Sequence, residues 1–293
     1  MHMPGHVRPS STDSTGDEVS RVLRIHPRYH RWHVDEGVEW VEPNTGYAHL
    51  DWKIPLSEAA LVLVDVWNQH YLKDTQARAE EIIQSRVRPL LSCARKAGLP
   101  IIHAPSPPQA KEHPAWQRLF GEPGEKRDGC TEEGGIQVAD SEPDTWPPED
   151  FRSRQGKYAQ YAMPDEPRDA EREAHRAALR MHPDIQPERE EAIVATGDEL
   201  HDYCSQRGIL FLFFLGFNTN ACILLRDYGT IEMAKRGYGV VILRDCTTGM
   251  ESPETHADLW QTRGAVLFLE MFGNYSLTSQ ELIAGLSGAI ALD

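Results

Sequence analysis

The fold is decided by residues 209–222, which read ILFLFFLGFNTNAC. Seven consecutive apolar residues that end at a glycine are typical of a strand covered on both faces of a parallel sheet. Residues 223–234 then show apolar positions at helical spacing, and the Lys-Arg-Gly run at 235–237 is typical of a helix end. The pattern predicts a strand, a tight turn and a helix whose first turn contains Cys222. The positive end of a helix dipole favours a thiolate, so a nucleophile is expected there.

The same kind of patterning on the N-terminal side of this stretch predicts more of the sheet. Residues 59–66 (AALVLVDV) and 100–104 (PIIHA) read as buried strands, and a helical segment at 75–97 joins them. Further elements are expected as strands at 191–195 and 238–243 and helices at 198–207 and 253–271. The predicted fold class is therefore α/β, a three-layer α/β/α arrangement around a parallel sheet.

The chain is expected to divide into an N-terminal arm and extension at 1–57 and one large domain at 58–293. Residues 1–20 read as a mobile arm, and the aromatic-rich residues 22–52 as a hairpin or a partner-contacting extension. The stretch at about 105–189 is rich in proline, glycine and charge. It is too long for an ordinary connection and is expected to be an insertion, a lid or an oligomer contact.

Composition limits the function classes. The 293 residues carry a formal net charge of -15, which opposes nonspecific binding to nucleic acid or to an anionic membrane. No apolar run approaches the ~20 residues of a membrane span, and the first twenty residues lack the apolar centre of a signal peptide. The five scattered cysteines suit free thiols in a reducing compartment. We expect a cytoplasmic protein with a small-molecule substrate, no nucleic-acid partner and no membrane partner.

Candidate chemistry gathers at the predicted carboxyl ends of strands, where open parallel sheets bind ligands. Asp65, His103, the turn at 218–222 and Asp245 all follow or end such strands. A carboxylate can take the proton of a thiol, and a nearby cation can hold that carboxylate ionised. Taken singly, a buried cysteine is more often part of the core, and an aspartate after a strand is often a helix cap. Together, Cys222 and Asp65 are the best candidates for catalytic residues.

Four segments resemble the isochorismatase-like cysteine hydrolases, a superfamily that includes nicotinamidase, N-carbamoylsarcosine amidohydrolase, and ureidoacrylate and biuret hydrolases. They are 62–68 (VLVDVWN), 216–222 (GFNTNAC), 236–240 (RGYGV) and 244–246 (RDC). The resemblance covers roughly residues 59–104 and 191–282. It implies a Rossmann-like six-stranded parallel sheet and an Asp-Lys-Cys triad, with Asp65 as base and Cys222 as nucleophile. It also implies a cis peptide bond between Phe217 and Asn218, and an oxyanion hole formed by the backbone N–H groups of Asn218 and Cys222.

The sequence departs from that family at the lysine. The family places it after a strand about thirty residues before the cysteine, yet residues 192–200 contain no lysine. Lys157, within the insertion, is the candidate for the third catalytic residue, and Arg152 or Arg154 are alternatives. The competing interpretation of Lys157 is an exposed surface lysine. Lys111 and Lys126 are weaker candidates.

The remaining site residues are predicted as binding groups. Trp67, Asn68, His70 and Phe217 are expected to bind substrate as the pocket wall. Some family members hold a metal through an aspartate and two histidines, but no compact Asp-x-His pair follows the first strand here, and a metal site needs several converging ligands. We therefore expect no metal and no cofactor.

The resulting hypothesis is an amidohydrolase that cleaves the C–N bond of a small linear amide, carbamoyl or ureido compound through a thioester. An isochorismatase-type vinyl-ether hydrolase is an alternative, and so is a catalytically silent member that acts as an interaction protein. A homo-oligomer, either dimer or tetramer, is expected. The identity of the substrate does not follow from the sequence.

Overall fold

The computed structural model describes residues 21–121, 146–188 and 190–290. The mobile arm expected at 1–20, the candidate Lys126 and part of the insertion lie outside these residues. The main sheet has eight strands in the order β3-β2-β10-β9-β8-β5-β6-β7, and β1 and β4 form a separate antiparallel pair. The strands are β1 (Val22–Ile25), β2 (Arg28–Arg31), β3 (Gly46–His49), β4 (Trp52–Pro55), β5 (Ala59–Val64), β6 (Ile101–Ala104), β7 (Ala192–Ile193), β8 (Phe211–Phe217), β9 (Gly239–Thr248) and β10 (Tyr275–Leu277).

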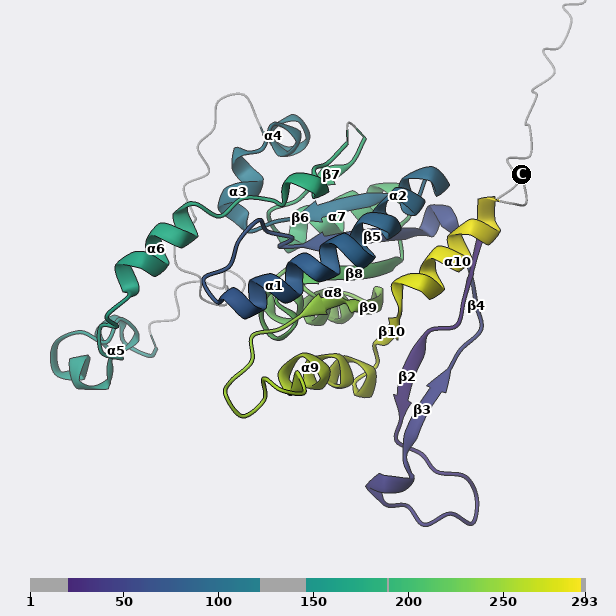
Figure 1. Ribbon diagram of the computed structural model, residues 1–293, viewed down its shortest axis with the longest axis horizontal. Helices are drawn as coiled ribbons and strands as arrows, with labels where there is room; N and C mark the ends of the chain where they lie inside the picture. Colours follow the sequence, from purple (N-terminus) through teal and green to yellow (C-terminus); the bar gives the residue numbers. More distant parts are fainter. Residues whose placement is uncertain (1–20, 122–145, 189, 291–293) are drawn as a thin grey trace, which may run out of the picture.

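Six of these strands form the parallel sheet that the family resemblance implies. The strands from β10 through β9, β8, β5 and β6 to β7 pair in parallel with their neighbours. The sheet as a whole is mixed, because β2 joins β10 in the antiparallel sense and β3 pairs antiparallel with β2. The sequence pattern of 22–52 predicts this hairpin but not that it extends the central sheet. Figure 1 shows the hairpin projecting away from the body of the molecule.

Helices cover both faces of the parallel sheet (Figure 1). They are α1 (Lys73–Ile82), α2 (Arg88–Ala97), α3 (Pro107–Glu112), α4 (Pro114–Phe120), α5 (Glu149–Arg152), α6 (Asp169–Ala177), α7 (Gly197–Arg207), α8 (Thr230–Lys235), α9 (Trp260–Met271) and α10 (Ser279–Ile290). A π-helical turn at Ile83–Val87 joins α1 to α2, so the helix expected at 75–97 is continuous. None of the helices in the described ranges is long and apolar enough to cross a membrane.

The alternation of buried side chains along β5 and β8 explains the three layers. Leu61, Leu63 and Phe213 belong to the core cluster that includes α1, α2 and α10. Val62 and Phe214 belong to the cluster on the opposite face, which includes α7, α8 and α9. Both strands are therefore apolar at every position, as expected for a sheet covered on both faces.

The carboxyl ends of three central strands lie level with one another. Val64, the last residue of β5, pairs with Gly216 of β8 on one side and with Ala104 of β6 on the other. A Cβ atom on Gly216 would lie 1.8 Å from the carbonyl oxygen of Val64, and Gly216 has a φ of 123°. Only glycine permits so close an approach at this backbone angle. The segments that follow these strands consequently meet at one edge of the sheet.

Two expectations about this region are wrong. The helix expected from Cys222 to residue 234 is instead a π-helical turn at Thr219–Ile223 followed by a break before α8. At the break, the hydroxyl of Thr230 donates a hydrogen bond to the carbonyl of Ile223 and replaces a helical N–H donor. Asp245 does not end its strand, because β9 continues to Thr248. Its carboxylate instead accepts hydrogen bonds from the backbone and hydroxyl of Ser279, where α10 begins.

The insertion carries short helices and returns to the sheet edge near β5. Met181 forms an isolated β-bridge with Trp67, and the backbone N–H of His182 donates to the carbonyl of Val66. The backbone N–H of Asn68 donates to the carbonyl of Arg180. The end of the insertion therefore forms a wall beside the residues that follow Asp65.

Candidate active site

Asp65 occupies the edge where the central strands end. It directly follows β5, is 4% exposed and has a φ of 45°, a left-handed conformation that short polar side chains tolerate better than most. Its Oδ1 accepts a hydrogen bond of 2.7 Å from the hydroxyl of Ser106, which lies two residues after β6. The carboxylate is thus oriented by a neighbouring strand end.

Arg226 is the cation beside this carboxylate. Its Nη2 lies 3.6 Å from Asp65 Oδ2 and donates a hydrogen bond of 3.1 Å to the hydroxyl of Ser106. Ser106 therefore accepts from the guanidinium and donates to the carboxylate. Burial lowers the pKa of Arg226, but the surrounding anionic groups, Asp65 first among them, outweigh burial and raise it. The guanidinium stays charged and stabilises the ionised carboxylate.

The thiol of Cys222 lies near both charged groups, because Asp65 and Arg226 each influence its pKa. Burial raises the pKa of the Cys222 thiol to about 12, with the Asp65 carboxylate adding to the rise and Arg226 opposing it. The expectation of a thiolate stabilised by a helix dipole is therefore wrong. Cys222 lies in a π-helical turn of five residues beside an anion, and its resting form is the protonated thiol.

The structure does not bring Lys157 to this pair. Lys157 is exposed, and its ammonium lies 4.9 Å from the centre of the Tyr158 ring. Arg152 pairs with Glu149, and the guanidinium of Arg154 lies over Phe151. These three basic residues belong to a region of the insertion that Figure 1 places well away from β5 and β8.

Sequence reasoning missed Arg226, although a signal for it exists. Residues four apart share one face of a helical turn, and Arg226 lies four positions after Cys222. Arg226 lies next to Asp65 because their two segments meet at the same edge of the sheet. This proximity cannot be read from sequence periodicity. Ser106 was missed because it belongs to the irregular start of the insertion.

Three of the four residues predicted for the pocket wall pack together, but only Trp67 lines the small pocket beside Asp65. The ring centre of Trp67 lies 5.1 Å from that of His70 and 5.1 Å from that of Phe217. Asn68 has another contact, because its Oδ1 accepts from the backbone N–H of Arg180 in the insertion. Trp67, His70 and Phe217 are thus brought together, while Asn68 anchors the insertion.

The turn that carries Cys222 has the backbone form implied by the resemblance. The peptide bond between Phe217 and Asn218 is cis. The carbonyl of Asn218 accepts hydrogen bonds from the N–H groups of Ala221 and Ile223, which closes the turn below the cysteine. The oxyanion role of the N–H groups of Asn218 and Cys222 remains a prediction.

The histidines near the site do not fit a metal. His70 Nδ1 accepts a hydrogen bond from the backbone N–H of Leu72, and its Nε2 faces Asn218. His103 Nε2 pairs with Glu191 at 2.8 Å. Within the part of the chain that the structure describes, no group of three or more His, Cys, Asp or Glu side chains could hold a metal ion.

A very small pocket, with a volume of about 10 Å³, adjoins Asp65. It is lined by Asp65, Val66, Trp67, Pro105, Ser106, Gln109, Leu179, Arg180 and Met181, so the insertion supplies most of its wall. A cavity of this volume holds about one water molecule, so a substrate would need the wall formed by the insertion to move outward.

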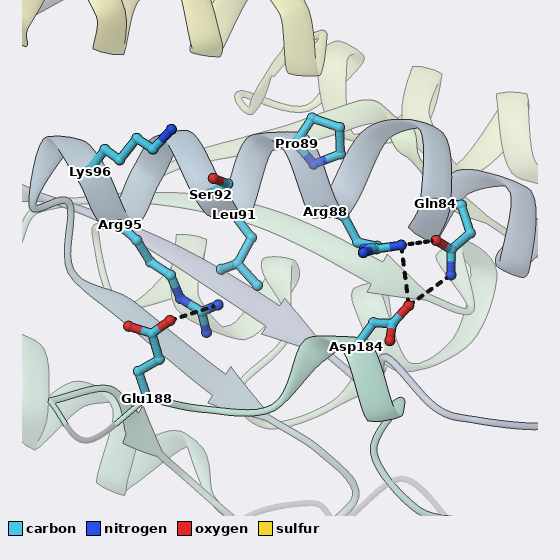
Figure 2. Close-up of a pocket in the computed structure, with 9 residues that line it drawn as sticks. All are labelled: Gln84, Arg88, Pro89, Leu91, Ser92, Arg95, Lys96, Asp184 and Glu188. Carbon is cyan, nitrogen blue, oxygen red and sulfur yellow. Dashed lines mark hydrogen bonds and ion pairs between the residues drawn. The ribbon is translucent and has the colours of Figure 1, made fainter.

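A second pocket lies between α2 and residues 184–188 and shares no lining residue with the first (Figure 2). Its arginines are already paired within the protein. Arg88 contacts Gln84 and lies 3.4 Å from Asp184, and Arg95 lies 3.2 Å from Glu188. We assign no function to this pocket.

Three buried polar atoms of the candidate site have no partner in the protein. Asp65 Oδ2, Asn218 Oδ1 and Arg226 Nε are all buried and make no hydrogen bond within the described structure. Unpaired buried polar atoms cost about 1–3 kcal/mol each, so proteins retain them mainly where a ligand or solvent pairs with them. Their position is consistent with a polar substrate between Asp65 and Asn218.

The chain is similar to several known proteins. A family model described as the isochorismatase domain matches residues 59–271. Similar solved structures include a cysteine hydrolase from Pseudomonas syringae pv. phaseolicola, with 17% identity, a TM-score of 0.49, and coverage of 81% of this chain and 96% of that chain. An isochorismatase family protein from Desulfovibrio vulgaris has 14% identity and a TM-score of 0.43, and the match covers 80% of this chain and 98% of that chain. A nicotinamidase from Acinetobacter baumanii has 17% identity and a TM-score of 0.40, and the match covers 77% of this chain and 98% of that chain. No curated protein matches the sequence.

Proposed function

The chain belongs to the isochorismatase family, and from this premise we propose that it is a cysteine-dependent hydrolase of the C–N bond in small linear amide, carbamoyl or ureido compounds. In this proposal Cys222 is the nucleophile, Asp65 is the general base and Arg226 is the cation. The observation that carries it is the buried Asp65 carboxylate with an arginine 3.6 Å away, close enough to Cys222 to influence the pKa of its thiol.

The first half-reaction acylates the cysteine. Asp65 takes the proton of the Cys222 thiol while the sulfur attacks the substrate carbonyl carbon and forms the C–S bond. The pKa of Cys222, raised to about 12, makes this proton transfer part of the attack. The backbone N–H groups of Asn218 and Cys222 stabilise the developing oxyanion. Protonated Asp65 then returns the proton to the nitrogen as the C–N bond breaks, which releases the amine and leaves a thioester.

The second half-reaction restores the enzyme. Asp65, again ionised, takes a proton from a water molecule that attacks the thioester carbonyl. The C–S bond breaks, the acid product leaves and the proton returns to the sulfur. Arg226 neither gains nor loses a proton in this cycle, because a guanidinium remains charged in proteins. Its contribution is to stabilise the carboxylate form of Asp65, with Ser106 as a positioning residue between them.

The thiol mechanism is tested with three purified proteins, namely wild type, Cys222→Ala and Cys93→Ser. Cys93 lies on α2, where its thiol contacts the carbonyl of Ile283, and it serves as the matched cysteine control. Ammonia release is measured over a panel of small amides, carbamoyl compounds and ureas, and mass spectrometry detects the acyl adduct. We expect wild type and Cys93→Ser to turn over the same compounds and to carry an acyl adduct on Cys222.

The outcomes separate the alternatives. Full activity in Cys222→Ala would contradict the thiol mechanism. Release of pyruvate from isochorismate by wild type and by Cys222→Ala alike, without turnover of the panel, would favour a vinyl-ether hydrolase, whose chemistry does not require the cysteine. Absence of turnover and of adduct across the panel in wild type would favour a catalytically silent protein.

A further inference from the structure

The hydrogen bonds of His70 determine which of its ring nitrogens carries the proton. His70 is 9% exposed, and its Nδ1 accepts a hydrogen bond of 3.0 Å from the backbone N–H of Leu72. A ring nitrogen that accepts from an N–H group has no proton of its own. Burial lowers the pKa of His70 to about 4, so the ring is neutral near pH 7. Its single proton therefore lies on Nε2, which acts as a donor.

That donor faces the side-chain amide of Asn218. His70 Nε2 lies 3.5 Å from Asn218 Nδ2, while Asn218 Oδ1 is buried without a partner. In this arrangement two donors face each other and an acceptor is unpaired. A half-turn of the amide about its Cβ–Cγ bond pairs the oxygen with Nε2–H. The NH₂ group then takes the buried position that has no partner in the protein.

Asn218 lies in the turn that carries Cys222, so this NH₂ group belongs to the candidate site. Asn218 is 7% exposed and closes the turn that carries Cys222. His70 packs against Trp67, and Trp67 lines the small pocket together with Asp65.

We propose that the side-chain NH₂ of Asn218, held in place by His70, is a specificity-determining donor that binds a second acceptor oxygen of the substrate. This inference rests on the proposed function and deepens it. The substrate class is an amide or ureido compound with another carbonyl or carboxylate oxygen close to the hydrolysed carbonyl. In the proposed mechanism the backbone N–H groups of Asn218 and Cys222 donate hydrogen bonds to the hydrolysed carbonyl. The side-chain NH₂ of Asn218 is therefore left to donate to the second oxygen. A buried donor left unpaired discriminates against a compound that lacks that oxygen.

The tautomer of His70 can be measured without any enzymatic activity. Histidine ring ¹⁵N and attached proton signals are recorded by NMR on wild type, and His70 is assigned by comparison with His70→Gln. We expect a neutral ring with its proton on Nε2 at pH 7. A proton on Nδ1 would overturn the proposal, because Nε2 would then accept from the Asn218 NH₂ and leave only the amide oxygen for a ligand.

The specificity role is tested with Asn218→Asp, which keeps an acceptor for His70 but removes the donor. The probes are malonamide, with its second carbonyl, and acetamide, without it. We expect wild type to prefer malonamide by at least ~10-fold in kcat/KM and the variant to lose most of that preference. An equal fall in kcat/KM for both probes would show that Asn218 affects the reaction without recognising the second oxygen, and would overturn the inference. Thermal unfolding of the variant checks that it folds.

A second experiment distinguishes failure of the proposed function from failure of the inference about Asn218. If wild type hydrolyses neither probe, malonamide and acetamide are titrated into Cys222→Ala while the side-chain NH₂ signals of Asn218 are followed. Shifts with malonamide and none with acetamide would support the donor role although the reaction had been assigned wrongly. No shift with malonamide would overturn it.

Discussion

The Arg226 guanidinium lies 3.6 Å from the Asp65 carboxylate, and the hydroxyl of Ser106 bridges the two groups. The Arg226 side chain is 28% exposed and that of Asp65 is 4% exposed, so the pair is shielded from solvent mainly on the carboxylate side. The cation of the proposed site therefore comes from the segment that carries the cysteine. A planar guanidinium can contact a carboxylate and a hydroxyl at once, which an ammonium does less well.

The first prediction concerns the identity of this cation. Arg226→Gln is expected to lower kcat/KM by about a hundredfold or more, because removing one partner of a buried ion pair leaves the other uncompensated. Arg226→Lys is expected to recover part of the loss. Lys157→Gln is the matched control and should retain wild-type kcat/KM, since its side chain is exposed and lies over Tyr158. A large loss in Lys157→Gln with a small one in Arg226→Gln would reverse the assignment.

The second prediction concerns the close approach of β5 and β8. Gly216→Ala would place a Cβ atom 1.8 Å from the carbonyl oxygen of Val64 at a φ that disfavours alanine. We expect a loss of about 3 kcal/mol or more in the free energy of unfolding. Gly264→Ala is the control in α9, where the new Cβ has no neighbour within 4 Å. It should stabilise the protein by about 0.5–1 kcal/mol, measured by denaturant unfolding. Equal stability of the two variants would contradict this interpretation.

The third prediction is a pH dependence of stability. Burial alone would raise the pKa of Glu191, but hydrogen bonds from His103 and Arg95 outweigh burial and lower it from 4.5 to about 2. A carboxylate with a depressed folded-state pKa stabilises the protein above the unfolded pKa and loses that contribution as the pH falls through the folded pKa. The window is therefore about pH 4.5 down to pH 2, and the contribution is about 3 kcal/mol.

Unfolding by urea across this window measures the effect. Wild type should lose stability as the pH falls, and Glu191→Gln should be less stable at pH 7 with a flatter pH profile. Glu188→Gln is the control, because Glu188 also pairs with Arg95 but its side chain is 65% exposed. Exposed pairs contribute about 0–1 kcal/mol. A profile of Glu191→Gln parallel to that of wild type would show that this carboxylate does not cause the pH dependence.

Strand periodicity predicted most of the sheet and that Asp65 and Cys222 would lie near each other. The apolar run of β5 is fully buried and that of β8 is buried from Leu212 onward, and Asp65 and Cys222 lie close because parallel strands end at one edge. The cis bond at Phe217 and the helix α7 were also predicted correctly. These features depend on local sequence or on the resemblance, so they could be read without tertiary structure.

The rest depends on contacts between segments distant in sequence. Ser106 reaches Asp65 only because β6 lies next to β5, and Met181 reaches Trp67 only because the insertion folds back. The protonated state of Cys222 likewise results from burial beside a carboxylate that is far away along the chain. Helix-dipole reasoning failed there because burial, and after it the full charge of Asp65, outweigh the partial charge of a short turn.

The last prediction separates the acidity of Cys222 from its usefulness in catalysis. Burial is the main cause of its raised pKa, and the negative charge of Asp65 is the next. Asp65→Asn removes that charge, so the pKa of Cys222 should fall and the thiolate fraction at a given pH should rise. Alkylation of Cys222 by iodoacetamide at pH 9, followed by peptide mass spectrometry, should therefore be faster in Asp65→Asn than in wild type.

The turnover rate of Asp65→Asn should fall, although its rate of alkylation rises. Asparagine cannot accept the thiol proton or return it to the leaving amine, so kcat should fall by about 10²–10⁴-fold even though the thiolate is more abundant. Cys93, with its thiol near α10, reports any general change in accessibility within the same digest. Slower alkylation of Cys222 in Asp65→Asn would mean that Asp65 promotes ionisation of the thiol in the resting enzyme, and the concerted proton transfer would have to be abandoned.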